Sequence, residues 1–331
     1  MAAEELLVIL TVTMNAAVDE AVAVDDFVLG GSNRCRLDAL DAGGKGLNAS
    51  RVIHRLNRLT IALGFVGGVT GQMVRARLDE ERVLHAFDDV PELTRLNVMI
   101  YESSSGRRSR LYLPGATVAP ERLGSLRTRL LQAHPGGTVI LGGSLPPGLE
   151  SSTYAALVSW LHERGVRAVV DTSGPALSAV LPARPLLIKP NVEEAAECLG
   201  CTLSGDDEVL AAALALRARG PANVVISQGE GGAIGVSAGG AWKALAPRVT
   251  ARSTVGSGDS MVAGLTIALD EGGSLEDGLR LGTAAGAATA MIPGTQLCNV
   301  QDVERLLPEV DVKPIVRRSE VRLRSDRRDR D

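Results

Sequence analysis

Aromatic residues are scarce in this chain, at 2% of 331 residues, with two Trp, three Tyr and three Phe. A hydrophobic core must therefore be built from Ala, Val, Leu and Ile. Because 45% of the residues are hydrophobic, the chain can bury one large α/β domain or two modest ones. No internal repeat or Ser/Pro-rich linker divides the body, so we expect one main domain.

Long apolar runs are also missing: none approaches the roughly 18 residues that a membrane span needs. The first residues, Met1–Leu7, carry two acidic side chains where a signal peptide would be basic. We therefore expect a cytoplasmic protein. The four cysteines fit reduced thiols. Cys198 and Cys201 have CxxC spacing, but without a second pair or a His cluster a metal or redox site is disfavoured.

Charge is unevenly distributed along the chain. Residues 313–331 contain eight basic and four acidic residues, about +4, which leaves the body at about −8. An acidic body is a poor general binder of nucleic acid. The tail has no sustained apolar face, which favours disorder over a basic docking segment.

A glycine-punctuated turn, Ser253-Thr-Val-Gly-Ser-Gly-Asp-Ser-Met-Val-Ala-Gly264, runs directly into an apolar helix. Gly256 and Gly258 let the backbone approach a ligand, and the helix points unpaired N–H groups and its positive dipole end at the same place. This pattern predicts an anion site. Asp259 at its mouth is either a carboxylate favoured in a first helical turn or a base that removes a proton.

Other polar groups follow predicted strands. The buried run Leu6–Thr13 leads to Asp19, which lies where open α/β sheets bind ligands or simply caps a turn. Asp41-Ala-Gly-Gly-Lys-Gly-Leu-Asn48 opens a helix with a turn suited to anionic ligands, in which Lys45 adds charge or is solvated. It is not a P-loop, because GxxxxGK[ST] is absent from the chain.

From Thr138 to Leu199 strands and helices alternate, which predicts βαβ units and a parallel sheet with helices on both faces. Asn191 and Glu194 have the spacing of a helix capping box, or of a carboxylate that organises a metal. Residues 94–113 predict a hairpin with Arg95 and Arg110 on its arms, as solvated charges or phosphate clamps. With 20–41, this hairpin would form a small β lid. The helix predicted over Leu275–Met291 has small residues on almost every face, which permits close approach of a helix or a flat ring.

Together these motifs resemble the ribokinase-like (PfkB-type) carbohydrate kinases, over roughly residues 6–310. The likeness is strongest to the sugar-phosphate branch: 1-phosphofructokinase, tagatose-6-phosphate kinase and the minor 6-phosphofructokinase. The two glycine-rich turns resemble the two family signatures, with Ser257 where Ala is usual. The segments 143–148, 171–174, 187–194 and 293–295 agree in place and order. The resemblance implies an α/β fold with a mostly parallel sheet, flanking helices and a small β lid.

The resemblance also implies roles for individual residues. Asp259 would be the general base, and Gly256, Ser257 and Gly258 would form the anion hole. The residues implied for the sugar phosphate are Asp19, Gly43, Gly44, Lys45, Asn48, Arg95, Arg110 and Ser144. Those implied for ATP are Lys189, Asn191, Ser227, Gly229, Gly232, Thr254, Thr283 and Ala287. Asn191 and Glu194 would organise Mg²⁺ largely through water, and a monovalent cation such as K⁺ would lie among Ser253, Val255, Thr289, Ile292, Gly294 and Gln296.

The implied activity is ATP-dependent phosphorylation of a ketohexose phosphate, with fructose 1-phosphate favoured and fructose 1,6-bisphosphate as product. Gly-Gly-Lys-Gly and residues 65–71 favour fructose 1-phosphate or tagatose 6-phosphate, whereas residues 110–115 and 296–299 are closer to the 6-phosphofructokinase type. A catalytically silent sugar-phosphate sensor is the alternative from another class; Asp259 speaks against it. Exposed apolar residues on the lid strands predict a homodimer.

Overall fold

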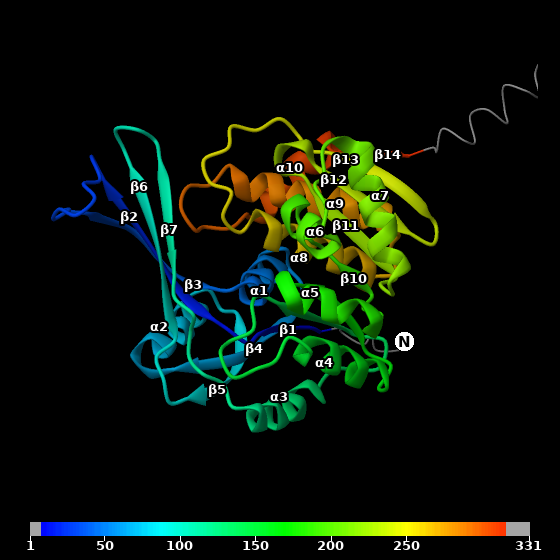
Figure 1. Cartoon of the computed structure of the whole chain (residues 1–331), viewed down its shortest axis with the longest axis horizontal. Helices are drawn as coiled ribbons and strands as arrows, with labels where there is room; N and C mark the ends of the chain where they lie inside the picture. The colour runs from blue at the N-terminus through cyan, green and yellow to red at the C-terminus, as the bar shows by residue number, and fades with distance from the viewer. Residues whose placement is uncertain (1–7, 316–331) are drawn as a thin grey trace, which may run out of the picture.

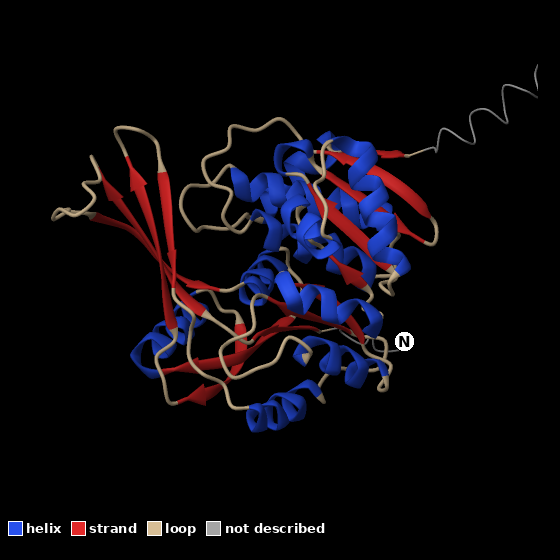
Figure 2. Ribbon diagram, in the orientation of Figure 1, coloured by secondary structure: helices blue, strands red, loops and turns tan. Residues whose placement is uncertain are grey.

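The structure is a computed structural model that describes residues 8–315. It contains a ten-stranded sheet with helices on both faces and a separate four-stranded sheet (Figure 1, Figure 2). The strand order in the large sheet is β14-β13-β12-β11-β10-β9-β8-β1-β4-β5. The predicted α/β class with a mostly parallel sheet is confirmed.

In the large sheet, the seven neighbouring strands β5, β4, β1, β8, β9, β10 and β11 are parallel to one another. The strands β12, β13 and β14 each pair antiparallel with the strand before them. Continuous Val, Ile and Leu runs make the central strands, which are buried on both faces. The bounds are β1 (Ile9–Thr13), β4 (Thr60–Gly67), β5 (Leu84–Val90), β8 (Thr138–Gly142), β9 (Arg167–Asp171), β10 (Leu187–Ile188), β11 (Asn223–Ser227), β12 (Ala233–Ser237), β13 (Gly240–Leu245) and β14 (Asp311–Pro314).

The two larger apolar clusters lie between this sheet and its helices, and a third, smaller one packs α2 against β4. Side chains from α3, α4, α5, α6 and α7 form one cluster, and those from α1, α8, α9 and α10 form the other. As predicted from composition, Leu, Val, Ile and Ala dominate both. The bounds are α1 (Lys45–Arg55), α2 (Gly68–Glu80), α3 (Leu123–Leu130), α4 (Thr153–His162), α5 (Gly174–Val180), α6 (Val192–Leu199), α7 (Gly205–Ala218), α8 (Ser257–Asp270), α9 (Leu275–Ala290) and α10 (Val300–Leu306).

The four-stranded sheet has the order β3-β2-β6-β7 and is drawn at the left of Figure 1. It consists of β2 (Ala17–Val24), β3 (Arg36–Gly43), β6 (Arg95–Glu102) and β7 (Arg108–Tyr112). The hairpin predicted over 94–113 is present as β6 and β7. Because Asp19 pairs with Asn97 and Asn97 with Tyr112, these three side chains share one face, and Glu20, Val98 and Leu111 share the other.

Three elements were not predicted from the sequence. The strand β5 occupies 84–90, where an exposed Leu84 and two acidic residues hide the strand pattern. The helix α3 is short, and the strand β14 follows α10 near the end of the described residues. The charged segment 313–331 overlaps β14 at Lys313 and Pro314, and its part from 316 onward lies outside the described residues. Within 8–315, no helix combines the length and apolar character that a membrane crossing requires.

Candidate active site

The amino terminus of α8 lies at the carboxyl edge of the large sheet. Gly256 precedes the helix with φ of 77°, a conformation that glycine adopts without strain. The first helical hydrogen bond runs from the amide of Ser260 to the carbonyl of Gly256, at 2.8 Å. The amides before Ser260 therefore lie at the open end of the helix, where the macrodipole favours an anion.

Asp259 is in the first turn of this helix and faces α1. The amide Nδ2 of Asn48 donates to its Oδ2 at 2.8 Å, across 211 residues of sequence. Burial, followed by the nearby Asp171, raises the pKa of Asp259 to about 6, while Lys45, Asn48 and Lys189 lower it. A carboxylate with this pKa is ionised at neutral pH and is more basic than an ordinary Asp.

Acidic and basic side chains together surround Asp259. Asp171, which ends β9, is buried, and its Oδ1 lies 3.0 Å from Lys45 Nζ and 3.8 Å from Lys189 Nζ. Lys45 Nζ also lies 3.4 Å from Glu194 Oε1. The side chain of Lys189 lies against the anion site. Its Nζ would be 3.4 Å from a Cβ placed on Gly258. Asp171 begins the motif 171–174 but was not predicted as a site residue; its position at the end of a strand was the available signal.

Asn191 and Glu194 form the capping box that begins α6. Asn191 Oδ1 accepts from the Glu194 amide at 2.7 Å, and Glu194 Oε2 accepts from the Asn191 amide at 2.9 Å. The capping interpretation is therefore confirmed. It leaves Glu194 Oε1 directed to Lys45, whose Nζ also contacts Asp171. The other carboxylate oxygen of Asp171, Oδ2, is buried without a hydrogen-bond partner. These carboxylate oxygens are the ligand type that Mg²⁺ prefers, so the donor set fits this ion.

Asp19 lies on β2, at the base of the four-stranded sheet. Asn97 Nδ2 donates to its Oδ1 at 2.7 Å, and its carboxyl group covers Gly43 so closely that a Cβ there would overlap it. Burial raises the pKa of Asp19, while Asn97 and Arg95 lower it. Asn97 was missed by sequence analysis. Its alternation with Arg95 along one strand was a signal that could have found it.

Arg95 and Arg110 lie on opposite sides of Asp19 along the sheet. Arg95 donates to the backbone oxygens of Asn15 and Leu113, each at 3.1 Å. Arg110 pairs with Met99, two residues beyond Asn97. The backbones of Arg95 and Arg110 are therefore separated along the sheet, and a role for both at the substrate's phosphate stays a prediction. In the loop after β8, Ser144 Oγ accepts from Asn15 Nδ2 at 3.1 Å, close to this region.

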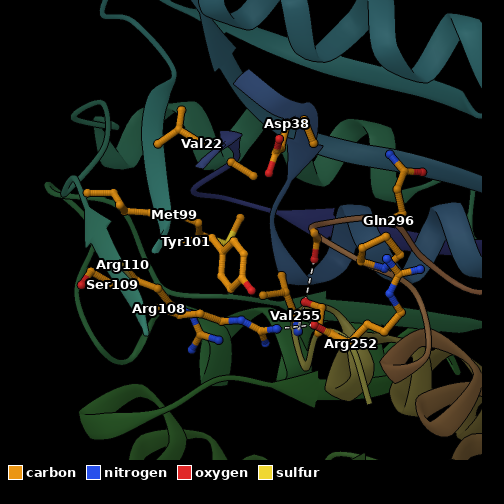
Figure 3. Close-up of a pocket in the computed structure, with 16 residues that line it drawn as sticks. Val22, Asp38, Met99, Tyr101, Arg108, Ser109, Arg110, Arg252, Val255 and Gln296 are labelled. Atoms are coloured by element: carbon orange, nitrogen blue, oxygen red, sulfur yellow. Dashed lines mark hydrogen bonds between the residues drawn. The ribbon is translucent and has the colours of Figure 1, made fainter. Parts of the chain in front are cut away.

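A cavity of about 570 Å³ separates the outer half of the four-stranded sheet from loops of the main body. Figure 3 shows Arg108, Arg110 and Tyr101 on one side, with Arg252 and Gln296 on the other. Arg108 donates to the backbone oxygen of Arg252 across it. Its lining reaches Ser253 and Val255 but does not include Asp259, Asp19 or Asn48, so the cavity adjoins the charged cluster rather than enclosing it.

The six residues predicted around a monovalent cation lie on two neighbouring loops and the end of α9. Ser253 Oγ donates to the Gly294 carbonyl at 2.6 Å, and the Ile292 amide donates to the Thr289 carbonyl at 3.0 Å. Gln296 Nε2 instead donates to Asp41 Oδ1 at 3.0 Å, so its side chain anchors the loop to β3.

The residues predicted for ATP lie beyond Lys189 along the same sheet edge. Ser227 and Asn191 form a bridge between neighbouring strands, and Gly229 and Gly232 have positive φ angles in the turn that follows. Thr254 is exposed at the loop before α8. Their role in binding ATP stays a prediction.

The small residues of α9 serve helix packing. A Cβ on Gly264 of α8 would lie 2.7 Å from the Cα of Gly282, so the two backbones are in direct contact. Thr283 is buried, and its Oγ1 has no hydrogen-bond partner. Packing against α8 alone explains most of the small face, and a role for Thr283 and Ala287 at a nucleotide base stays a prediction.

The CxxC pair takes no part in this site. Cys198 is half-buried at the end of α6, with its Sγ 3.3 Å from Ser178 Oγ, while Cys201 is exposed. Both are free thiols. Within residues 8–315, no three His, Cys, Asp or Glu side chains gather closely enough to hold a metal ion by themselves.

Comparison with known proteins shows the family of this chain. The family model described as pfkB family carbohydrate kinase matches residues 12–302. ATP-dependent 6-phosphofructokinase isozyme 2 of Escherichia coli is 34% identical over 300 residues, covering 90% of this chain and 97% of that protein. The 1-phosphofructokinase of Bacillus subtilis is 34% identical over 304 residues, covering 92% and 99%.

Among solved structures, phosphofructokinase-2 of Escherichia coli in complex with potassium superposes with a TM-score of 0.87 at 33% identity, covering 92% of this chain and 99% of that one. The matches span nearly the whole described chain, including both glycine-rich turns and Asp259. This chain belongs to the pfkB family of carbohydrate kinases.

Proposed function

We propose that the protein transfers the γ-phosphoryl group of ATP to a ketohexose phosphate, with fructose 1-phosphate as the preferred substrate and fructose 1,6-bisphosphate as the product. The observation that carries the proposal is Asp259, held by Asn48 at the open end of α8 with two lysines nearby. A base, an anion site and fixed positive charge are what phosphoryl transfer to a hydroxyl requires.

In this mechanism Asp259 accepts the proton of the attacking hydroxyl. Its pKa of about 6 keeps it ionised at pH 7 and able to take that proton. The amides of Gly256–Gly258 point at the transferring group from the helix end, and Lys189 adds charge from below. All of these groups are positioned by the fold before substrate arrives, so they need little rearrangement during the reaction.

Mg²⁺ would be held by Asp171 and Glu194, in part through water, beside Asn191. When bound, it neutralises charge on the ATP phosphates. For K⁺, the supporting observation is that carbonyl and hydroxyl oxygens of Ser253 and Gly294 lie together behind the anion site. Phosphofructokinase-2 of Escherichia coli has been solved in complex with potassium, which supports a role for K⁺ in this protein.

The four-stranded sheet supplies the sugar side of the site and acts as a lid. Asp19 and Asn97 would hold hydroxyl groups, and Arg95 lies beside them with its Nε buried and unpaired, as a partner for the substrate's own phosphate. Gly43 is required here because the Asp19 carboxyl group occupies the space of a side chain.

A homodimer through this sheet completes the proposal. The face opposite Asp19 carries Leu37 and Leu111, which are 56% and 54% exposed, together with Val98. An exposed apolar sheet face is a liability unless another chain covers it. Pairing of two such faces would bury it.

The test is a coupled assay of ADP formation with fructose 1-phosphate, fructose 6-phosphate, tagatose 6-phosphate and fructose. We expect kcat/KM to be highest for fructose 1-phosphate and lowest for fructose. A higher value with fructose 6-phosphate or tagatose 6-phosphate would move the protein to the corresponding member of the same branch. Absence of ADP formation with every sugar, despite measurable sugar-phosphate binding, would instead indicate a sensor.

A further inference from the structure

Lys45 is the first residue of α1 and follows Gly44, whose φ is 125°. Its side chain is one-third exposed and ends between two carboxylates, with Asp171 Oδ1 at 3.0 Å and Glu194 Oε1 at 3.4 Å. These partners come from β9 and α6, both in the main body. The ammonium group therefore lies at the edge of the large sheet rather than on the lid.

The charged side chains near Lys45 are the same ones that lie near Asp259. Asp171 and Glu194 contact the ammonium group of Lys45 directly, and Asp259 is close enough to interact with its charge. Lys189 lies on the other side of Asp171, 3.8 Å from its Oδ1. Two ammonium groups thus flank one buried carboxylate next to the base.

Arg95 belongs to a different group of residues. It donates to the backbone of Asn15 and Leu113 and attracts Asp19, all on or beside the lid. Asp19 in turn is bound by Asn97 on the neighbouring strand. Basic residues are therefore available at two separate places, one near the lid and one near Asp259.

Substrate chemistry assigns one end of the sugar to each place. In a ketohexose phosphate the phosphate ester and the acceptor hydroxyl are at opposite ends of the molecule, C1 and C6. Because the acceptor hydroxyl must reach Asp259 to lose its proton, the ester must lie away from Asp259. A cation among the partners of Asp259 is then too close to the reacting hydroxyl to bind the ester.

We infer that Lys45 acts on the transferred phosphoryl group and not on the substrate's own phosphate. The inference rests on the proposed kinase function. The acceptor oxygen bonds to the γ-phosphorus, its proton passes to Asp259, and the bond to the β–γ bridging oxygen breaks, with its electron pair leaving on ADP. Lys45 keeps its proton and neutralises charge on the non-bridging oxygens of the transferred group.

The first test separates kcat from KM. Lys45→Met should lower kcat by about 10²–10³-fold, the usual effect of losing one charge-stabilising group, with KM for the sugar phosphate within about threefold. The preference for fructose 1-phosphate over fructose should persist. Lys45→Arg retains the charge and should recover part of kcat. An unchanged kcat, or a loss carried by KM with a collapsed preference for the phosphorylated sugar, would overturn the inference.

The second test measures binding without turnover. In an Asp259→Asn background, calorimetric titration with fructose 1-phosphate should give the same Kd with or without Lys45→Met. Arg95→Met is the matched control and should weaken binding at least tenfold. If Lys45→Met and Arg95→Met weaken fructose 1-phosphate binding equally, while both variants keep the circular dichroism spectrum of the folded protein, the inference is contradicted. Wild-type turnover in the first assay tests the kinase function separately.

Discussion

The edge of the large sheet and the four-stranded sheet are built differently. Around Asp259, four chain segments far apart in sequence are joined by short contacts: Asn48 to Asp259 at 2.8 Å, Lys45 to Asp171 at 3.0 Å and Lys45 to Glu194 at 3.4 Å. The lid strand β7 is exposed along its whole length. The difference suggests that the reaction type is fixed by a preformed, cross-linked centre, whereas substrate choice depends on a more open surface.

Substitution at the sugar side should have a large effect carried by KM. Asp19→Ala removes a charged acceptor for the sugar hydroxyls, so we expect kcat/KM to fall by about 100-fold, as for loss of charge-assisted hydrogen bonds worth ~3 kcal/mol. Glu20→Ala changes the adjacent residue on the opposite face and should leave kcat/KM within threefold. If the loss of kcat/KM in Asp19→Ala came from kcat alone, it would contradict the assignment of substrate binding to the four-stranded sheet and of chemistry to the centre around Asp259.

The pH profile probes the centre itself. Because Asp259 must be ionised to act as a base, kcat/KM should decrease as pH falls through about 6. Asn48→Ala removes a donor that favours the ionised form, so the pKa of Asp259 rises and the midpoint should move to higher pH. Asn33→Ala, in the loop between β2 and β3, should not shift the midpoint. An unchanged midpoint in Asn48→Ala would show that a group other than Asp259 sets the pH dependence of kcat/KM.

The smallest effect on chemistry is expected on the outer face of the lid. Leu111→Glu places a charge in the proposed dimer interface and should yield monomers in sedimentation at micromolar concentration, with the fold unchanged by circular dichroism. Leu131→Glu, at an equally exposed leucine outside the sheet, is the control. If wild-type protein is monomeric, or if Leu111→Glu remains dimeric, this face is not the interface.

The same contrast explains how far sequence could reach. Asp259, Asp19 and Asn191 were predicted because each follows a strand or opens a helix within a recognisable motif. The partners of Lys45 could not be predicted, because Asp171 and Glu194 approach it only through the folded sheet, 126 and 149 residues away. The strand β5 was missed because polar residues and an exposed Leu84 obscure alternation at the sheet edge.

The role of Asp259 is the central claim, and Asp259→Asn tests it most directly. Turnover should fall by about 10²–10⁴-fold, the usual contribution of a general base, while fructose 1-phosphate still binds in calorimetry. Because the folded state raises the pKa of Asp259, its ionised form destabilises the fold above that pKa, so the Asn variant should also have a higher Tm at pH 7.5. Turnover retained within about tenfold, or ~1.4 kcal/mol, would contradict the account.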